Sequence, residues 1–168
     1  IGAVGWLWER LKAPLYATPF TAYLLRDKLR EAGILDAVSL TEVPLSGSFK
    51  IGPFDLELIT LTHSIPEPNG LAIRTPLGVI LHTGDWKIDA DPMLGSPTDV
   101  AALRKLGDEG VLAMVCDSTN VFVEGEAGSE ADVRIALTRL IGSLKGKIAA
   151  ATFASNVARI DTILALAA

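Results

Sequence analysis

Apolar and polar positions along the chain follow two periods, one typical of helices and one typical of strands. Apolar residues recur at helical spacing in 5–11 (GWLWERL) and in 21–33 (TAYLLRDKLREAG), where Gly33 is placed to end the helix. The apolar run 13–18 (APLYAT) between these two segments predicts a short strand. Helix-like and strand-like segments continue to alternate along the chain, which indicates the α/β class.

The middle of the chain is rich in strand patterns. In 54–63 (FDLELITLTH) a polar start gives way to residues that are apolar on both faces, so we expect its C-terminal end to be buried. Pro76 and Gly78 lie between two apolar runs and predict a hairpin turn. The strands expected here are 36–43, 54–63, 71–75 and 78–84.

The last third predicts helices that alternate with buried strands. Thr98 and Ser129 are each placed to cap the start of a helix. Near-continuous apolar runs at 111–118 (VLAMVCDS) and 146–153 (GKIAAATF) are typical of strands covered on both faces. The expected helices are 99–110, 129 to about 140, and 154–168.

Composition and charge exclude several kinds of site but do not identify a function. With 168 residues and 49% hydrophobic residues, the chain can form a sizeable core. A formal net charge of −5 gives no basic surface for nucleic acid, and a single cysteine excludes an internal disulfide and a multi-cysteine zinc site. We find no charged-then-apolar leader and no long apolar run, so we expect a cytoplasmic protein without a membrane segment.

Three polar residues follow apolar strands at the point where each strand ends. His63 follows LELITLT, Asp85 follows VILHTG, and Asp117 follows VLAMVC. Strand ends are where α/β proteins commonly carry functional side chains, because the strand fixes the backbone and the loop leaves the side chain accessible. Each residue taken alone also has a structural interpretation, as a hydrogen-bonded histidine or as a carboxylate that organises a turn.

Together these residues lie in motifs that resemble a known family. The segment LTHSIPEPNGLAIRTPLGVILHTGDWKID (61–89) is similar to the region of bacterial ribonuclease J that carries the third and fourth metal motifs of the metallo-β-lactamase fold. VCDSTN (115–120) resembles the first β-CASP motif, and ATFASNVARI (151–160) resembles the FASN segment of that family. The similarity covers essentially the whole chain.

The resemblance implies a site with two divalent metal ions, zinc first and manganese or magnesium as alternatives. His63 would be a metal ligand through an imidazole nitrogen, and the Asp85 carboxylate would bridge the two ions. Asp85 and Asp117 would be the catalytic acidic residues. Imidazole and carboxylate are ligand types that zinc and manganese use.

The resemblance gives other polar residues weaker roles. His82 has no ligand role in the family pattern, so we interpret it as a structural residue or as support behind the metal ligands. Ser155 and Asn156 lie where an expected strand runs into a helix, a place suited to holding a phosphate or an RNA backbone. The same two residues would also serve as an ordinary helix start.

The resemblance also implies how the chain is organised. We expect part of a metallo-β-lactamase αββα sandwich in 1–120 and the beginning of a β-CASP α/β domain in 121–168. The family motif HxHxDH would end just before Ile1, and the later β-CASP histidines would lie beyond Ala168. We therefore expect an internal fragment that is inactive alone and holds an incomplete metal pair.

The parent is expected to hydrolyse RNA phosphodiester bonds in RNA processing and decay, as a homo-oligomer. The resemblance implies 5′-to-3′ exonuclease action, with endonuclease action as an option. Two alternatives stay open. One is another hydrolase of the same fold or a DNA nuclease, and the other is a non-catalytic paralogue that binds RNA or protein.

Overall fold

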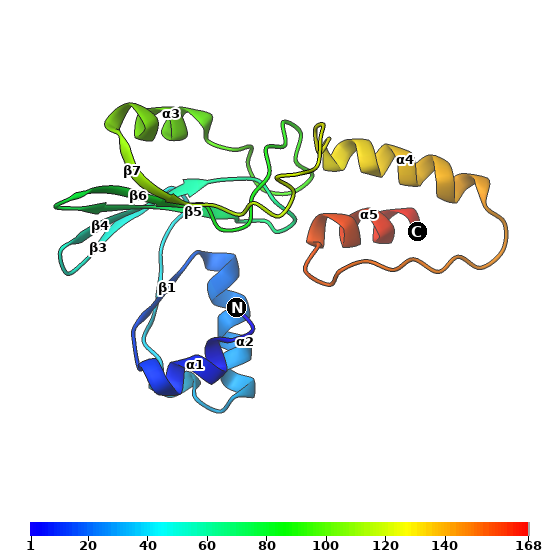
Figure 1. The fold of residues 1–168 in the computed structure, drawn as a ribbon. Helices are drawn as coiled ribbons and strands as arrows, with labels where there is room; N and C mark the ends of the chain where they lie inside the picture. Colours follow the sequence, from blue (N-terminus) through cyan, green and yellow to red (C-terminus); the bar gives the residue numbers. More distant parts are fainter. Residues whose placement is uncertain (168) are drawn as a thin grey trace.

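A five-stranded mixed sheet forms the centre of the computed structural model, which describes residues 1–167 (Figure 1). Its strands, in spatial order, are β3 (Ser48–Ile51), β4 (Phe54–Thr60), β5 (Asn69–Thr75), β6 (Gly78–His82) and β7 (Val111–Val115). Neighbouring strands are antiparallel from β3 to β6, and β6 and β7 are parallel. Strands β4, β6 and β7 therefore all run in the same direction.

Helix α3 (Val100–Glu109) connects β6 to β7 and covers one side of the sheet (Figure 1). Its Leu106 is 2% exposed and packs into the main core. The sheet contributes four buried residues to that core: Ile59, Ala72, Val79 and Leu81. Burial of such apolar side chains is what holds the helix on the sheet.

An N-terminal unit lies on the other side of the sheet (Figure 1). It comprises α1 (Val4–Leu11), β1 (Leu15–Ala17), α2 (Pro19–Glu31), the 3-10 turn η1 (Leu35–Ala37) and β2 (Leu40–Glu42). β1 and β2 pair in parallel, and a small separate core of Ala17, Ala22 and Leu25 packs against Val4 and Leu40.

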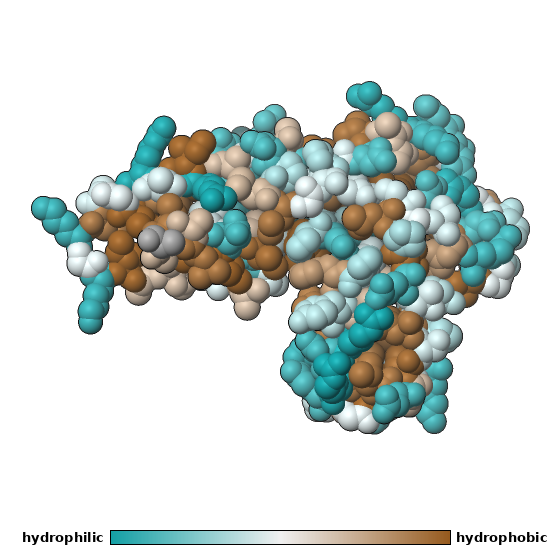
Figure 2. Space-filling model, turned by 180° about the vertical axis from the view of Figure 1, so that it is seen from behind, coloured by the Kyte–Doolittle hydropathy of each residue, from teal (hydrophilic) through white to brown (hydrophobic). Residues whose placement is uncertain are grey.

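Two C-terminal helices, α4 (Glu130–Ser143) and α5 (Val157–Ala167), pack on each other and extend from the sheet (Figure 1). Ser129 caps α4 in a reciprocal capping box with Asp132. Figure 2 shows apolar side chains exposed over this pair of helices. Leu140 of α4 and Leu164 of α5 are 55% and 65% exposed. No helix within residues 1–167 is both long and apolar enough to cross a bilayer.

The α/β class and most of the expected elements are confirmed. Gly33 has a left-handed backbone (φ 71°) just after α2, as expected for a helix stop. The predicted hairpin is the β5–β6 pair, and the end of the 54–63 segment is buried, with Leu61 and Thr62 each 2% exposed.

The predicted strand 36–43 and the predicted Thr98 cap differ from the structure. Only Leu40–Glu42 of segment 36–43 is a strand, because η1 takes up its start. Helix α3 is capped by Asp99, whose carboxylate accepts the Ala102 N–H at 2.8 Å. Thr98 instead places its hydroxyl 3.0 Å from that of Thr62 inside the protein.

The two apolar runs predicted to be buried strands are not buried. All five residues of β7, an edge strand of the sheet, are exposed. Residues 146–153 form no strand, and all are exposed, including Phe153 at 83%. An apolar run predicts burial, but the covering partner must come from elsewhere, and for these runs residues 1–167 supply none.

The loop after β4 is packed against Gly95. Gly95 has φ +76°, and a Cβ added there would meet the backbone oxygen of Pro66 at 2.3 Å. The close approach leaves no room for a side chain. Both the left-handed backbone and this contact require glycine.

We therefore expect Gly95→Ala to lower the free energy of unfolding by at least about 1–2 kcal/mol. The matched control is Gly107→Ala in α3, where an added Cβ meets nothing within 4 Å. That change should raise the free energy of unfolding by about 0.5–1 kcal/mol. Urea denaturation of the three proteins measures both effects, and equal stability of Gly95→Ala and the unsubstituted protein would contradict the close contact.

Candidate active site

The three predicted site residues lie at one edge of the sheet. His63 comes three residues after β4, Asp85 three residues after β6, and Asp117 two residues after β7. Because these three strands run in the same direction, their C-terminal ends meet at a common edge. The sheet topology thus gathers residues that are up to 54 positions apart in the sequence.

A cleft of about 340 Å³ at this edge brings together His63, Asp85 and Ser155. Thr18 and Thr21, at the start of α2, also line it. The loop after β4 supplies the rest of the polar lining through Ser64, Glu67 and Asn69. The cleft therefore has carboxylate, imidazole, hydroxyl and amide groups, and within residues 1–167 neither lysine nor arginine lines it.

A second hollow of about 280 Å³ shares His63 and Ser155 with the cleft. It is bordered by Lys87, Glu130 and Asn156. The residues that the sequence placed at the start of the last helix thus lie beside the predicted metal ligand. Their roles stay predictions, but their proximity is a property of the fold.

Asp117 lies in a hollow of its own beside Trp86. Its backbone is fixed by the loop that carries Asp85: the Asp117 N–H donates to Thr83 Oγ1 at 3.2 Å, and its carbonyl accepts the Trp86 indole N–H at 3.3 Å. Hydrogen bonds from the Thr119 hydroxyl and N–H lower the pKa of the Asp117 carboxyl below its ordinary value. Asp117 is therefore held as a carboxylate near the cleft.

His82 lies apart from these groups. It is exposed at the end of β6, opposite Leu71 on β5, and it lines neither the cleft nor the two hollows. A role behind the metal ligands stays a prediction. Among residues 1–167, no cluster of three or more histidine, cysteine or acidic side chains is placed to hold one metal ion. His63 and Asp85 share the cleft as a pair.

Glu67 is a site residue that the sequence patterns missed. Its Oε2 accepts the N–H of Phe20, in the first turn of α2, at 2.8 Å. Thr18, the N-cap of α2, makes no side-chain cap of its own, so Glu67 satisfies a helix N–H from outside the helix. The other end of the loop is tied by Asn69, whose amide donates to the Glu67 carbonyl at 2.8 Å. Glu67 stands in the quoted motif, but its partner lies 47 residues earlier, which no local pattern reveals.

Removal of this external cap should loosen α2. We expect Glu67→Ala to lower the free energy of unfolding by about 0.5–2 kcal/mol, the range for lost N-terminal caps. Glu67→Gln keeps an acceptor oxygen and should lose less. Urea denaturation measures both, and a Glu67→Ala protein as stable as the original would show that the contact stabilises nothing.

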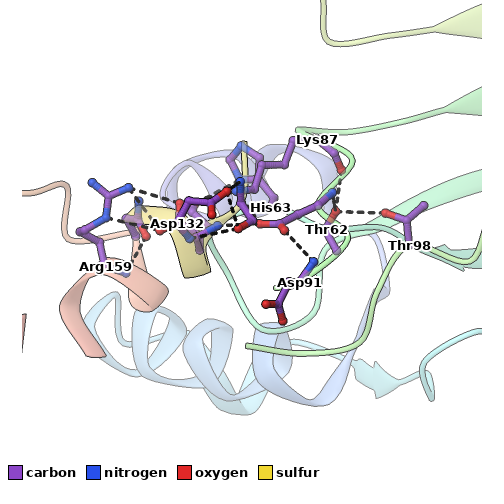
Figure 3. A network of polar contacts seen from close by, with 12 residues as sticks. Thr62, His63, Lys87, Asp91, Thr98, Asp132 and Arg159 are labelled. Carbon is purple, nitrogen blue, oxygen red and sulfur yellow. Dashed lines mark hydrogen bonds and ion pairs between the residues drawn. The ribbon is translucent and has the colours of Figure 1, made fainter. Parts of the chain in front are cut away.

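Four charged residues form a network beside the cleft, part of which Figure 3 shows. The Lys87 ammonium lies 2.9 Å from the Asp89 carboxylate and 3.5 Å from that of Glu130. Arg159 contacts Glu130 at 3.2 Å. Asp89 has a fully buried side chain, and Glu130 is 9% exposed. Both basic residues of this network are thus paired with carboxylates.

Asp89 remains charged in spite of its position. Burial alone would raise the pKa of its carboxyl, but the Lys87 ammonium and the N–H groups of Glu130 and Asp91 hold that pKa below its ordinary value of 3.8. A pKa that is lower in the folded than in the unfolded protein stabilises the fold above the unfolded pKa. This contribution is lost as the pH falls through the folded pKa.

We therefore expect the free energy of unfolding to fall as the pH is lowered from about 5 to about 2, and to fall less steeply in Asp89→Asn. At pH 7 the Asp89→Asn protein should be the less stable of the two, because Lys87 loses a charged partner. Urea denaturation across this range measures both slopes. Parallel slopes for the two proteins would contradict a charged, buried Asp89.

Two comparisons, with protein-family models and with the sequences of individual proteins, give different results. No protein-family model matches it. It is 44% identical over 162 residues to ribonuclease J of Sinorhizobium meliloti, 45% identical over 162 residues to that of Corynebacterium glutamicum, and 41% identical over 169 residues to that of Synechocystis. These matches cover 96–99% of the chain, which spans 29%, 22% and 26% of the lengths of those relatives.

A solved structure shares the fold. A crystal structure of a protein of unknown function from Enterococcus faecalis V583 aligns with 91% of the chain and 39% of its own length, with a TM-score of 0.65 and 20% sequence identity. At that identity the likeness concerns the fold alone. The sequence matches carry the assignment: this chain belongs to the ribonuclease J family.

Proposed function

We propose that the protein to which this chain belongs is a metal-dependent ribonuclease that hydrolyses RNA phosphodiester bonds. The names of the relatives support a nuclease. The observation that carries the proposal is the cleft in which His63 and Asp85 meet at the edge of the sheet, with Asp117 held close to it by the Asp85 loop.

The charge of the cleft supports a need for metal ions. Its ionisable lining groups are two carboxylates, Glu67 and Asp85, and the imidazole of His63. The neighbouring cations Lys87 and Arg159 are paired with other carboxylates. A phosphodiester carries a negative charge, so this lining would repel it unless cations are bound there first.

His63 and Asp85 have the donor chemistry to hold such cations, zinc first and manganese or magnesium as alternatives. A bound divalent pair supplies charge neutralisation at the phosphate and a water of lowered pKa. Asp85 and Asp117 are the proposed catalytic acidic residues. The low pKa of Asp117 keeps it an acceptor at neutral pH, able to orient a water or a hydroxyl group.

Ser155 and Asn156 are the proposed RNA contacts. The exposed Ser155 lines both the cleft and the second hollow, so its hydroxyl can reach a backbone that crosses them. Asn156 Oδ1 accepts the Arg159 N–H at 2.9 Å and caps α5, which leaves its amide nitrogen as a donor. His82 is proposed to act behind the ligands or as a structural residue.

The larger setting of the chain is part of the same proposal. Residues 1–120 would contribute to a metallo-β-lactamase αββα sandwich and 121–168 to a β-CASP domain. The parent would act on RNA as a cytoplasmic homo-oligomer, by 5′-to-3′ exonuclease action with endonuclease cleavage as an option. The chain alone would be inactive and would bind fewer than two zinc ions per molecule by elemental analysis.

The full-length protein from the same gene should release mononucleotides from 5′-monophosphorylated RNA in the presence of zinc or manganese. We expect Asp85→Asn to lower the rate at least about 100-fold, as for loss of a catalytic carboxylate. Asp161→Asn, at an exposed position of α5 outside the proposed site, is the control and should change the rate only a few-fold.

Each proposal can fail separately in this assay. Indifference to RNA with cleavage of single-stranded DNA would favour a DNA nuclease. No hydrolysis of either substrate, with RNA still bound, would favour a non-catalytic paralogue. Full activity of Asp85→Asn would reject the assigned site.

A further inference from the structure

The α4–α5 pair contacts the rest of the protein at a polar junction beside the cleft. The Val157 N–H, at the start of α5, donates to the Ser64 carbonyl at 3.0 Å, and Ser64 directly follows His63. The Glu130 N–H, at the start of α4, donates to Asp89 Oδ2 at 3.0 Å. The N-terminal ends of both helices are thus fixed to the two loops that carry His63 and Asp85.

The Glu130 carboxylate lies at the centre of this junction. It receives Arg159 from α5, with nitrogen to oxygen distances of 3.2–3.4 Å, and Lys87 from the Asp85 loop at 3.5 Å. It is not needed to cap its own helix, because Ser129 and Asp132 do that. Removal of Glu130 takes from Arg159 the carboxylate that it contacts and leaves Lys87 with Asp89 alone. Loss of a partner from a largely buried ion pair is unfavourable.

The junction determines where the proposed RNA contacts lie. Ser155 and Asn156 directly precede α5, and the second hollow lies between them, His63 and Glu130. If α5 shifts, Ser155 shifts relative to His63. Glu130 does not line the cleft that holds Asp85.

We propose that Glu130 is a positioning residue. By holding Lys87 and Arg159 together, it seats α5 on the His63 loop and fixes Ser155 opposite the proposed metal ligands. The seating, meaning the position of α5 on the loop that carries His63, depends only on contacts within this chain. Its consequence for RNA rests on the proposed function.

The chain offers a matched control for this idea. Arg134 and Asp161 also join α4 to α5, at 3.5 Å, but their side chains are 36% and 53% exposed. An ion pair exposed to water contributes little, so its loss should leave the helices in place. Asp161→Asn therefore removes one α4–α5 ion pair without disturbing the junction.

Amide hydrogen exchange of Val157 in the 168-residue chain tests the seating directly. We expect Glu130→Ala to speed this exchange at least roughly tenfold, Glu130→Gln to have a smaller effect, and Asp161→Asn to have none. The Leu58 amide, which donates to the Gly47 carbonyl within the sheet region, is the internal reference for an intact fold. Unchanged Val157 exchange in Glu130→Gln and Glu130→Ala, with Leu58 still protected, would overturn the proposal.

The full-length protein tests the consequence for RNA. Glu130→Gln should raise KM for RNA several-fold while zinc affinity stays unchanged, because His63 and Asp85 are not moved. A loss of zinc affinity, or a lower kcat at unchanged KM, would overturn the positioning role. If the full-length protein hydrolyses no RNA, the proposed function fails, and the Val157 measurement still decides the seating.

Discussion

The buried hydroxyl of Thr62 connects the loop after β4, the loop after β6 and the segment before α3. Thr62 directly precedes His63 and is 2% exposed; its hydroxyl donates to the Lys87 carbonyl at 2.6 Å and accepts the Asp89 N–H at 3.0 Å. Its carbonyl accepts the Lys87 N–H at 2.9 Å, and Thr98, just before α3, also meets its hydroxyl. The loop after β4 and the loop after β6 are therefore joined as a short extra piece of sheet, and the spacing of His63 and Asp85 depends on it.

The distribution of charge around the cleft is related to this contact between the two loops. Because the two loops are fixed together, Lys87 is directed toward Asp89 and Glu130, where it balances buried carboxylates. The neighbouring cleft is lined by the carboxylates of Asp85 and Glu67, and its lining within residues 1–167 includes no basic side chain to balance their charge. A net charge of −5 is compatible with binding RNA if the positive charge at the site comes from bound ions.

Local sequence signals predicted most of the helices and strands, whereas contacts with distant residues left no such signal. The strand ends identified His63, Asp85 and Asp117 as candidates, because an apolar run and the polar residue after it are adjacent in the chain. The pairs Glu67 with Phe20 and Glu130 with Arg159 connect segments 47 and 29 residues apart, and no periodic pattern contains them. The expected strand 146–153 failed for a related reason, since β-pairing needs a neighbour that the run itself does not specify.

The cluster of Lys87, Asp89, Glu130 and Arg159 has a consequence for how this sequence can vary. Two positive and two negative charges form a linear series of ion pairs, from Asp89 through Lys87 and Glu130 to Arg159. A single substitution leaves an odd charge, whereas an apolar replacement of the whole quartet need not. These four positions are therefore expected to change together during evolution. In a chimaera of two homologous proteins, the segments that carry them should come from the same homologue.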